Sequence, residues 1–230
     1  MTPTLAVREQ HTSRIGATVL QLLIAAVLPV LLVLLNARLV MSPAFLHFEY
    51  TRPDFPEDYF GLAMEERLQY APYAINYLLN GDNITYLGDL RFPDGTSLFN
   101  DRELRHMRDV KLMTQITFGG ALVAGILAVT AGYALLRSGR LARALMYGSL
   151  LTLGLIAAVV IVAIFSWETF FTSFHALFFA DGTWYFAYSD TLIRLFPEQF
   201  WFDAALLVGG LTTLEAGLIL LVIWYRNRAA

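Results

Sequence analysis

Two of the four histidines lie in contexts where they could do acid–base chemistry. His106 lies in ELRHMRDV, and His175 lies among phenylalanines in SFHALFF. Imidazole is the side chain whose ordinary pKa suits both uptake and release of a proton near neutral pH. Taken singly, each is better explained as an incidental polar residue or as a neutral core residue. Together, as histidines from two separate segments, they predict general acid–base chemistry on an amphipathic substrate.

Polar residues near the two histidines could support this chemistry. If ELRHMRDV is helical, Glu103 and Asp109 lie three residues before and after His106. Either carboxylate could then hold one imidazole nitrogen and fix the tautomer. Asp190 and Arg194 in SDTLIRLFP are four residues apart, so a helix would pair them. This pair is either a surface ion pair or a part of the site.

Aromatic residues are unusually dense after the third apolar run. Phe174, Phe178 and Trp184 lie there, close to His175 in sequence. An ordinary aromatic belt at a membrane surface needs fewer such residues than residues 165–202 contain. We therefore expect these three, together with Tyr73 from the segment after the first run, to contact substrate. Packing is the alternative role, and for Tyr73 it is the stronger one.

Several kinds of chemistry are excluded by what the sequence lacks. The chain has no cysteine, which excludes a thiolate nucleophile, a thiolate metal site and a disulfide. No G-x-S-x-G surrounds Ser173, and no H-E-x-x-H, P-loop or G-x-G-x-x-G occurs. With a net charge of −3, nothing suggests a nucleic-acid partner. We expect neither a metal nor a cofactor.

The elements that must position the histidines are membrane-spanning helices. The 230 residues are 57% hydrophobic, which exceeds the usage of ordinary soluble domains. Runs of about 20 apolar residues predict transmembrane helices, the structures whose backbone groups are satisfied within one segment. Four such runs cover residues 15–35, 112–136, 144–165 and 204–225. The fold class is therefore an all-α membrane protein with four transmembrane helices.

Positively charged residues predict the orientation in the membrane. Short loops rich in arginine and lysine stay on the cytoplasmic side. The arginines of the N-terminus, of the loop between the second and third spans and of the C-terminus are Arg8, Arg14, Arg137, Arg140, Arg143, Arg226 and Arg228. Both termini are thus expected in the cytoplasm. Residues 41–111 and 167–203 would then lie outside, with both histidines at the outer interface.

The organisation that follows has an extracytoplasmic cap inserted between the first two spans. The expected parts are 1–41 (tail and first span), 42–108 (cap), 109–168 (second span, arginine loop and third span), 169–203 (outer aromatic loop) and 204–230 (fourth span and tail). Glu215 lies near the middle of the fourth span. We assign it a structural role, bonded to a neighbouring helix.

Two stretches of the sequence resemble a known family. ELRHMRDVK, together with FHALFFADGTWYF and DTLIRLFPEQFW, is similar to the bacterial lipoprotein intramolecular transacylases (Lit). The resemblance covers almost the whole chain, with four spans, a cap and both motifs in order. It implies a multi-pass protein of the bacterial cell membrane. It also implies two catalytic histidines at the interface between cap and membrane, which map onto His106 and His175.

The resemblance also implies a substrate and a reaction. The substrate is a membrane-anchored lipoprotein whose N-terminal cysteine bears a diacylglyceryl thioether and a free α-amine. The sn-2 acyl chain moves from the glyceryl oxygen to this amine and gives a lyso-form lipoprotein. One histidine acts as the base on the amine, for which we favour His175. His106, supported by Asp109, then serves as the acid or stabilises the oxyanion.

Two other classes of protein remain open from the residues. A helical membrane bundle can hold haem between two histidines, although here both lie outside the apolar runs, which counts against it. A Soret band in the purified protein would decide the matter. The second class is a non-enzymatic membrane scaffold in which the histidines only pack. The transacylase is ranked first, the scaffold second and the haem protein third.

Overall fold

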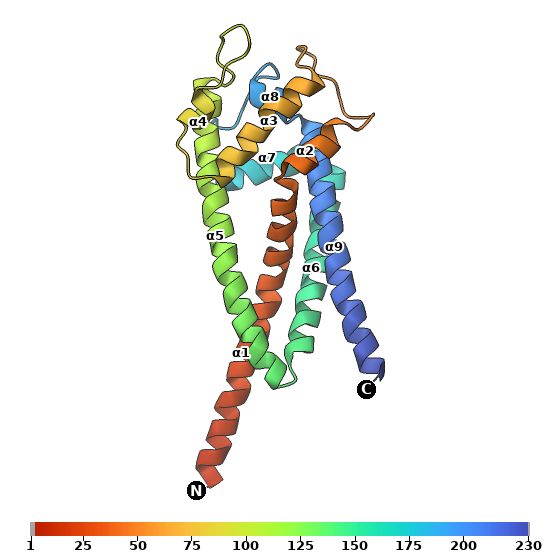
Figure 1. The fold of residues 1–230 in the computed structure, drawn as a ribbon. Helices are drawn as coiled ribbons and strands as arrows, with labels where there is room; N and C mark the ends of the chain where they lie inside the picture. Colours follow the sequence, from red (N-terminus) through yellow and green to blue (C-terminus); the bar gives the residue numbers. More distant parts are fainter. Residues whose placement is uncertain (1–2, 230) are drawn as a thin grey trace. The chain divides into compact units, whose positions relative to one another are not determined.

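The computed structural model describes residues 3–229, and their regular structure is helical (Figure 1). The helices are α1 (Pro3–Val40), α2 (Pro43–Tyr50), α3 (Met64–Leu79), α4 (Thr85–Gly88), α5 (Asp101–Arg137), α6 (Leu141–Phe165), α7 (Trp167–Phe178), α8 (Thr191–Leu195) and α9 (Glu198–Ala229). In the loop between α4 and α5, Arg91 and Ser97 form an isolated antiparallel β-bridge.

Four of these helices are long and apolar enough to cross a membrane. They are Arg14–Val40 within α1, and the whole of α5, α6 and α9. The prediction of four membrane spans is therefore confirmed. Three expected boundaries fall inside helices: 108 lies in α5, 168 in α7 and 203 in α9. The reason at α5 is local, because residues 101–118 contain no proline or glycine to interrupt the helix.

The chain divides into two compact units. The first contains the described residues up to Asn36, Gly120–Ile161 and those from Gly209 onward. In it, α6 approaches α1 closely at Gly148, where a Cβ atom would lie 2.8 Å from Leu28 Cδ2. Asn36 Nδ2 donates to Glu215 Oε2 at 2.9 Å and to Thr212 Oγ1 at 3.1 Å. Glu215 thus bonds a neighbouring helix, as expected.

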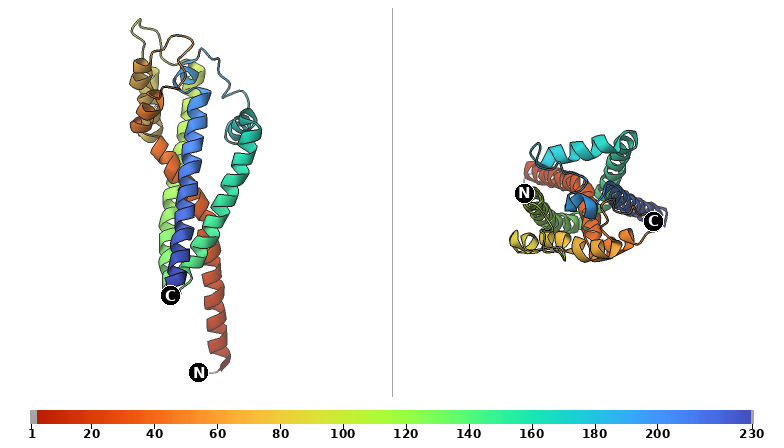
Figure 2. Two further views of the ribbon diagram at one scale, coloured as in Figure 1. Left: turned by 90° about the vertical axis from the view of Figure 1, so that its right-hand side faces the viewer. Right: turned by 90° about the horizontal axis from the view of Figure 1, so that it is seen from above.

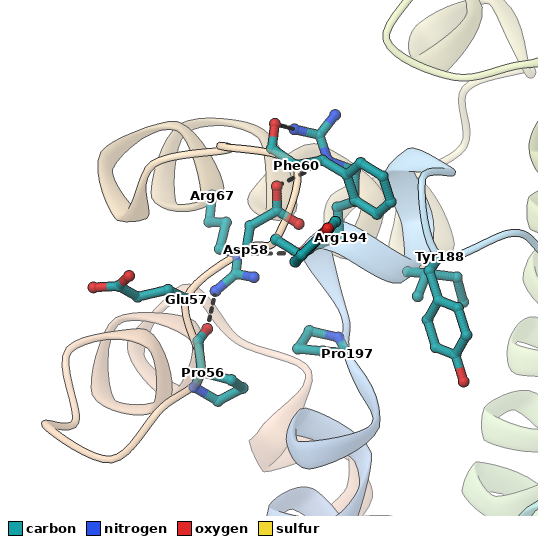
Figure 3. A pocket seen from close by; sticks show the side chains of 10 residues that line it. Pro56, Glu57, Asp58, Phe60, Arg67, Tyr188, Arg194 and Pro197 are labelled. Carbon is teal, nitrogen blue, oxygen red and sulfur yellow. Dashed lines mark hydrogen bonds and ion pairs between the residues drawn. The ribbon is translucent and has the colours of Figure 1, made fainter.

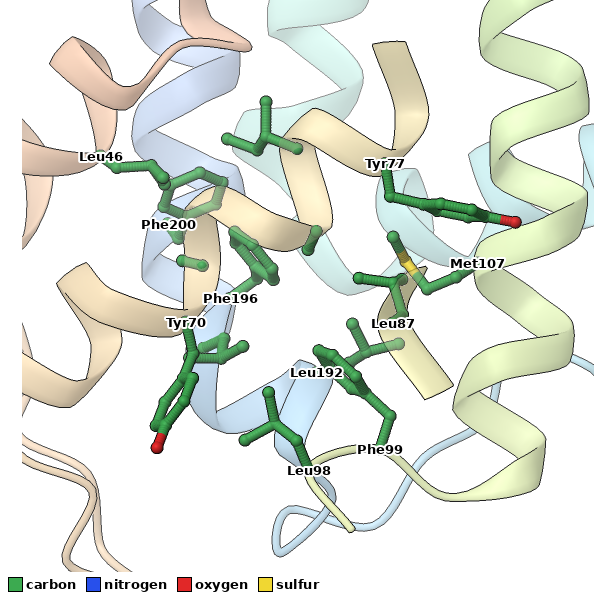
Figure 4. Packing of buried hydrophobic residues seen from close by; sticks show 14 of the residues in the cluster. Leu46, Tyr70, Tyr77, Leu87, Leu98, Phe99, Met107, Leu192, Phe196 and Phe200 are labelled. Atoms are coloured by element: carbon green, nitrogen blue, oxygen red, sulfur yellow. The ribbon is translucent and has the colours of Figure 1, made fainter. Parts of the chain in front are cut away.

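The second unit contains residues 37–119 and 162–208 and holds both candidate histidines. Here α3 contacts α2, α4 and α8. Figure 2 shows α8 between α3 and α7. The buried core joins these elements and includes Leu46, Tyr77, Leu87, Met107, Leu192, Leu195 and Phe200 (Figure 4). The short helices therefore share one hydrophobic core with the first turns of α5 and α9, so residues 41–100 are a folded part of the protein and no linker.

A buried carboxylate lies where α2 meets the start of α9 in this second unit. Glu49 is 1% exposed, and Arg52 Nη1 lies 3.2 Å from Glu49 Oε1 and 3.0 Å from Asp203 Oδ2. Burial raises the pKa of Glu49 to about 7, and the neighbouring Asp203 adds to the rise while Arg52 opposes it. The folded protein therefore keeps a proton on Glu49 that the unfolded chain loses near its ordinary pKa of 4.5.

This group is expected to make stability depend on pH. Between pH 4.5 and about 7 the folded state binds more protons at Glu49, so the free energy of unfolding falls as the pH rises through this window and levels off above it. Glu49→Gln should remove this contribution. Thermal unfolding in detergent across the window would show a flatter profile for the variant. The exposed Glu65→Gln should keep the wild-type profile; equal profiles for all three proteins would contradict the prediction.

Candidate functional site

His106 is positioned by the capped start of α5. Asn100 Oδ1 accepts hydrogen bonds from the amides of Arg102 and Glu103, and Glu103 Oε2 accepts one from the amide of Asn100. This reciprocal pair is a capping box, which fixes where the helix begins. Met107 packs in the core beside Leu87 and Tyr77 (Figure 4). The first turn is thus held in place around His106, which is 9% exposed.

His175 is positioned by α7, which begins directly after α6. Ser166 caps α7 by accepting a hydrogen bond from the amide of Thr169 at 3.1 Å. His175 Nδ1 lies 2.8 Å from the carbonyl oxygen of Phe171, one turn earlier. A carbonyl oxygen only accepts, so Nδ1 donates, and in the neutral ring Nε2 then carries the free lone pair. Burial lowers the pKa of His175, and the Phe171 carbonyl only partly opposes this shift.

The two histidines share one aromatic shell. The Phe179 ring lies 5.1 Å from the His106 ring and 5.9 Å from the His175 ring, between ring centroids. Phe186 lies 5.2 Å from His106, and Trp184 lies 4.9 Å from His175. Phe179 thus contacts both histidines, and aromatic rings surround the pair. Around the buried His106, polar interactions are stronger than in water.

Two polar nitrogens of this site are buried and have no hydrogen-bond partner among the described residues. They are His106 Nδ1 and Trp184 Nε1. A buried polar group without a partner costs about 1–3 kcal/mol. Native structures rarely keep such groups without a reason, and a binding or catalytic role is one such reason. These nitrogens are therefore candidates to bond a substrate.

The carboxylates predicted to support His106 have other positions. Glu103 Oε1 accepts from the amide of Leu192 at 2.6 Å, and Oε2 accepts from Asn100. Asp109 is exposed. Within residues 3–229, neither carboxylate bonds the imidazole of His106 in this structure. The expectation that one of them fixes its tautomer is therefore wrong, because each oxygen of the buried Glu103 is directed to a backbone amide instead.

The predicted pairing of Asp190 with Arg194 is also wrong. Asp190 Oδ2 instead lies 2.7 Å from Arg102 Nη2 and accepts from the amide of Ala187 at 2.9 Å. Arg194 pairs with Asp58 at 3.1 Å. The physical reason is that Asp190 stands at the N-cap of α8, a helix only five residues long, so tertiary partners determine both contacts. Asp190 and Glu103 together fasten the segment after α7 to α5.

Of the four aromatic residues predicted to contact substrate, only Trp184 and Phe174 lie beside a histidine ring. Trp184 covers His175, and Phe174 lies 5.7 Å from the same ring. Phe178 packs on Phe174 at 5.0 Å, and both phenylalanines are more than 40% exposed. Tyr73 packs on Tyr86, 5.9 Å away, within the segment between α1 and α5.

Sequence reasoning missed three members of the aromatic shell: Phe171, Phe179 and Phe186. For Phe171 and Phe179 a signal existed, because each is four residues from His175 and would share its helix face. Phe186 lies in an irregular segment and has no such signal. Among the described residues, no group of three or more histidine, aspartate or glutamate side chains could hold a metal ion.

Comparisons with known proteins identify relatives of this chain. A family model described as the lipoprotein intramolecular transacylase Lit matches residues 22–201. An uncharacterized protein of Aquifex aeolicus (strain VF5) is 33% identical over 201 residues, which are 87% of this chain and 91% of that protein.

Solved structures of Lit from Bacillus cereus share the fold. The form with one histidine replaced by arginine has a TM-score of 0.72 at 18% identity and covers 97% of each chain. The form with that histidine replaced by alanine has a TM-score of 0.71 at 19% identity and covers 96% of this chain and 100% of its own. With its four apolar helices and its match to the family model over most of its length, this multi-pass membrane protein belongs to the lipoprotein intramolecular transacylase (Lit) family of bacteria.

Proposed function

We propose that this protein moves an acyl chain within the N-terminal residue of a bacterial lipoprotein. The chain passes from the sn-2 glyceryl ester of a diacylglyceryl cysteine to the α-amine of the same cysteine. The observation that carries the proposal is the shared shell: His106 of α5 and His175 of α7 both contact Phe179, and Nε2 of His175 is left with a free lone pair. Family membership supplies the class of substrate.

In this proposal His175 is the base. The neutral amine attacks the ester carbonyl carbon, and Nε2 of His175 takes a proton from the nitrogen as the new C–N bond forms. The tetrahedral intermediate then collapses, the bond between carbonyl carbon and glyceryl oxygen breaks, and the departing oxygen receives, through His106, the proton that His175 took up. Overall an ester becomes an amide and an alcohol, with no net change in protons. Because burial lowers the pKa of His175, the imidazole is neutral and able to accept at neutral pH.

His106 would stabilise the negative charge that develops on the carbonyl oxygen and relay a proton to the leaving oxygen. A donor aimed at a developing oxyanion in a dry site is among the strongest catalytic contributions. Trp184 Nε1 is a second buried donor without a partner in the described chain, and it lies beside His175. We assign it to the ester carbonyl. The exposed faces of Phe174 and Phe178 would contact the acyl chains.

No enzyme nucleophile is required, because donor and acceptor belong to one molecule. Attack closes a medium-sized ring, and the main difficulty is to hold the substrate in that unfavourable conformation. Correct orientation of the reacting groups can lower the activation barrier by several kcal/mol. This agrees with a chain that has no cysteine and no serine motif.

We further infer that the site faces the outside of the cell membrane and that both termini lie in the cytoplasm. The support is the charge distribution, because the loop between α5 and α6 carries Arg137, Arg140 and no acid. Residues 42–100 would then form a cap on the outer face.

Mass spectrometry of a model lipoprotein tests this function. A host that lacks its own N-acylating enzymes would express the lipoprotein with this protein or with an empty vector. We expect the N-terminal lipopeptide to keep its total mass, while its fragments show one acyl group moved from glycerol to the amine. An unshifted fragment pattern in cells that contain folded protein would refute the assignment.

A further inference from the structure

A cavity of about 380 Å³ lies in the second unit, apart from the two histidines (Figure 3). It is lined by loop residues 56–60, by Arg67 of α3 and by residues of the segment 188–197. Neither histidine lines it, and neither do the rings of their shared shell. The proposed acyl transfer does not use this cavity.

Four charged side chains line the cavity, two arginines and two acids, but only one of the acids faces the arginines. Arg67 is 4% exposed, and it donates to two backbone carbonyls: those of Pro56 at 2.7 Å and Arg194 at 3.0 Å. Arg194 donates to Asp58 at 3.1 Å. Two guanidinium groups thus face a single carboxylate. The fourth charged group, Glu57, directs its carboxylate away from both of them (Figure 3).

Each guanidinium also retains donors that no described residue accepts. Arg67 uses Nε and Nη1, which leaves Nη2 without a partner within residues 3–229. Arg194 donates from Nε to Asp58 and from Nη2 to the carbonyl oxygen of Phe60 at 3.4 Å. Its Nη1 therefore has no partner among the same residues. A buried guanidinium with spare donors favours a ligand that offers carbonyl or carboxylate oxygens.

The rim of the cavity suits a polypeptide. Tyr59 is 93% exposed and Tyr188 is 82% exposed, and Pro56 and Pro197 add apolar walls. Tyrosine and arginine are the residue types that carry much of the binding energy in protein recognition. Arg67 already holds backbone carbonyls from this chain, which is the same chemistry that a bound peptide would offer.

The cavity is also within reach of the proposed reaction site along one segment. Tyr188 follows Trp184, which covers His175, by four residues. Four residues span at most about 14 Å when extended. A substrate held at the histidines by its lipidated cysteine therefore needs only a few further residues to arrive at the cavity.

We propose that this cavity binds the polypeptide that follows the lipidated cysteine and that it prefers an acidic segment. This inference rests on the proposed function for the identity of the substrate. Main-chain carbonyl and side-chain carboxylate oxygens occupy the spare donors of Arg67 and Arg194, and the two tyrosines cover the peptide. The cavity thereby selects lipoproteins by their peptide, whereas the histidine shell handles the lipid.

A binding measurement that needs no catalysis tests the proposal. Full-length protein in detergent would be titrated with a fluorescent, non-lipidated peptide containing aspartate, and with its asparagine counterpart. We expect the acidic peptide to bind more tightly, and Tyr188→Ala to weaken its binding about tenfold, as loss of a hot-spot contact does. Phe48→Ala, which changes a 59% exposed aromatic that does not line the cavity, should bind like the wild type.

A second measurement connects the cavity to the reaction. We expect Tyr188→Ala to raise the KM for a long acidic lipopeptide, relative to a minimal diacylglyceryl cysteine, by about tenfold. Transfer by wild-type protein without any peptide binding would overturn the cavity assignment and spare the function. Peptide binding without acyl transfer would contradict the proposed function and leave the cavity assignment in place. Binding of inorganic phosphate or of phosphatidylglycerol vesicles in place of the peptide would also overturn it.

Discussion

His175→Asn is expected to abolish acyl transfer while leaving the fold in place. The asparagine amide can still donate to the Phe171 carbonyl, as Nδ1 does, so the last turn of α7 keeps this contact. The variant lacks any counterpart of Nε2, so it has no base. General acid–base catalysis contributes about 10²–10⁴-fold to a rate, and we expect a loss of that order. Initial rates on a purified diacylglyceryl lipopeptide would measure it.

The pH profile of the wild-type enzyme provides an independent check on the same residue. The base must be unprotonated, and burial lowers the pKa of His175 below its ordinary 6.5. The part of the profile set by His175 should therefore fall only below pH 6.5, separate from the rise toward about pH 8 that follows the ordinary pKa of the substrate amine.

The exposed histidine His47 offers a matched control, because it lies in α2 and contacts none of the shell residues among the described contacts. His47→Asn should retain wild-type rates, whereas His106→Asn should fall with His175→Asn. Full activity in His175→Asn would remove the base from the mechanism.

Glu103→Leu is expected to cause the largest loss of stability of any single change near the site. The carboxylate is 1% exposed and accepts from two backbone amides. Leucine would leave the buried amide of Leu192 without a partner, at about 1–3 kcal/mol. Loss of the capping box adds about 1 kcal/mol. Transfer should fall as well, because the segment that carries Trp184 and Phe186 would no longer be fastened to α5.

Unfolding in detergent, followed together with transfer rates, would measure both effects. Glu103→Gln keeps one acceptor oxygen and should lie between the wild type and the leucine variant. Asp109→Leu serves as the control, since its exposed carboxylate makes none of the described contacts. Wild-type stability in Glu103→Leu would contradict the role given to Glu103. An Asp109→Leu that loses transfer would restore the original view that Asp109 supports His106.

The spans and the histidine pair could be read from the sequence because both depend on local patterns. Apolar runs of about 20 residues specify membrane helices by length alone. His106 precedes the second run and His175 follows the third, so the topology predicts that both lie at the same membrane interface. No contact between distant side chains had to be known.

The partners of charged residues could not be predicted, because they come from distant parts of the chain. Asp190 meets Arg102, 88 positions away, and Arg194 meets Asp58, 136 positions away. The spacing of four between Asp190 and Arg194 is a valid helical signal, but a five-residue helix is too short for it to prevail. The cavity lined by residues 56–67 and 188–197 could not be predicted for the same reason, since these two segments show no common motif.

The Glu103 carboxylate has a consequence for motion. It binds the amide at the start of α5 with one oxygen and the amide of Leu192 in α8 with the other. Fraying of the helix and release of the segment over the histidines therefore become one cooperative opening rather than two independent ones. If substrate enters by this opening, the same carboxylate sets how often the site is accessible, although it never touches the reacting atoms.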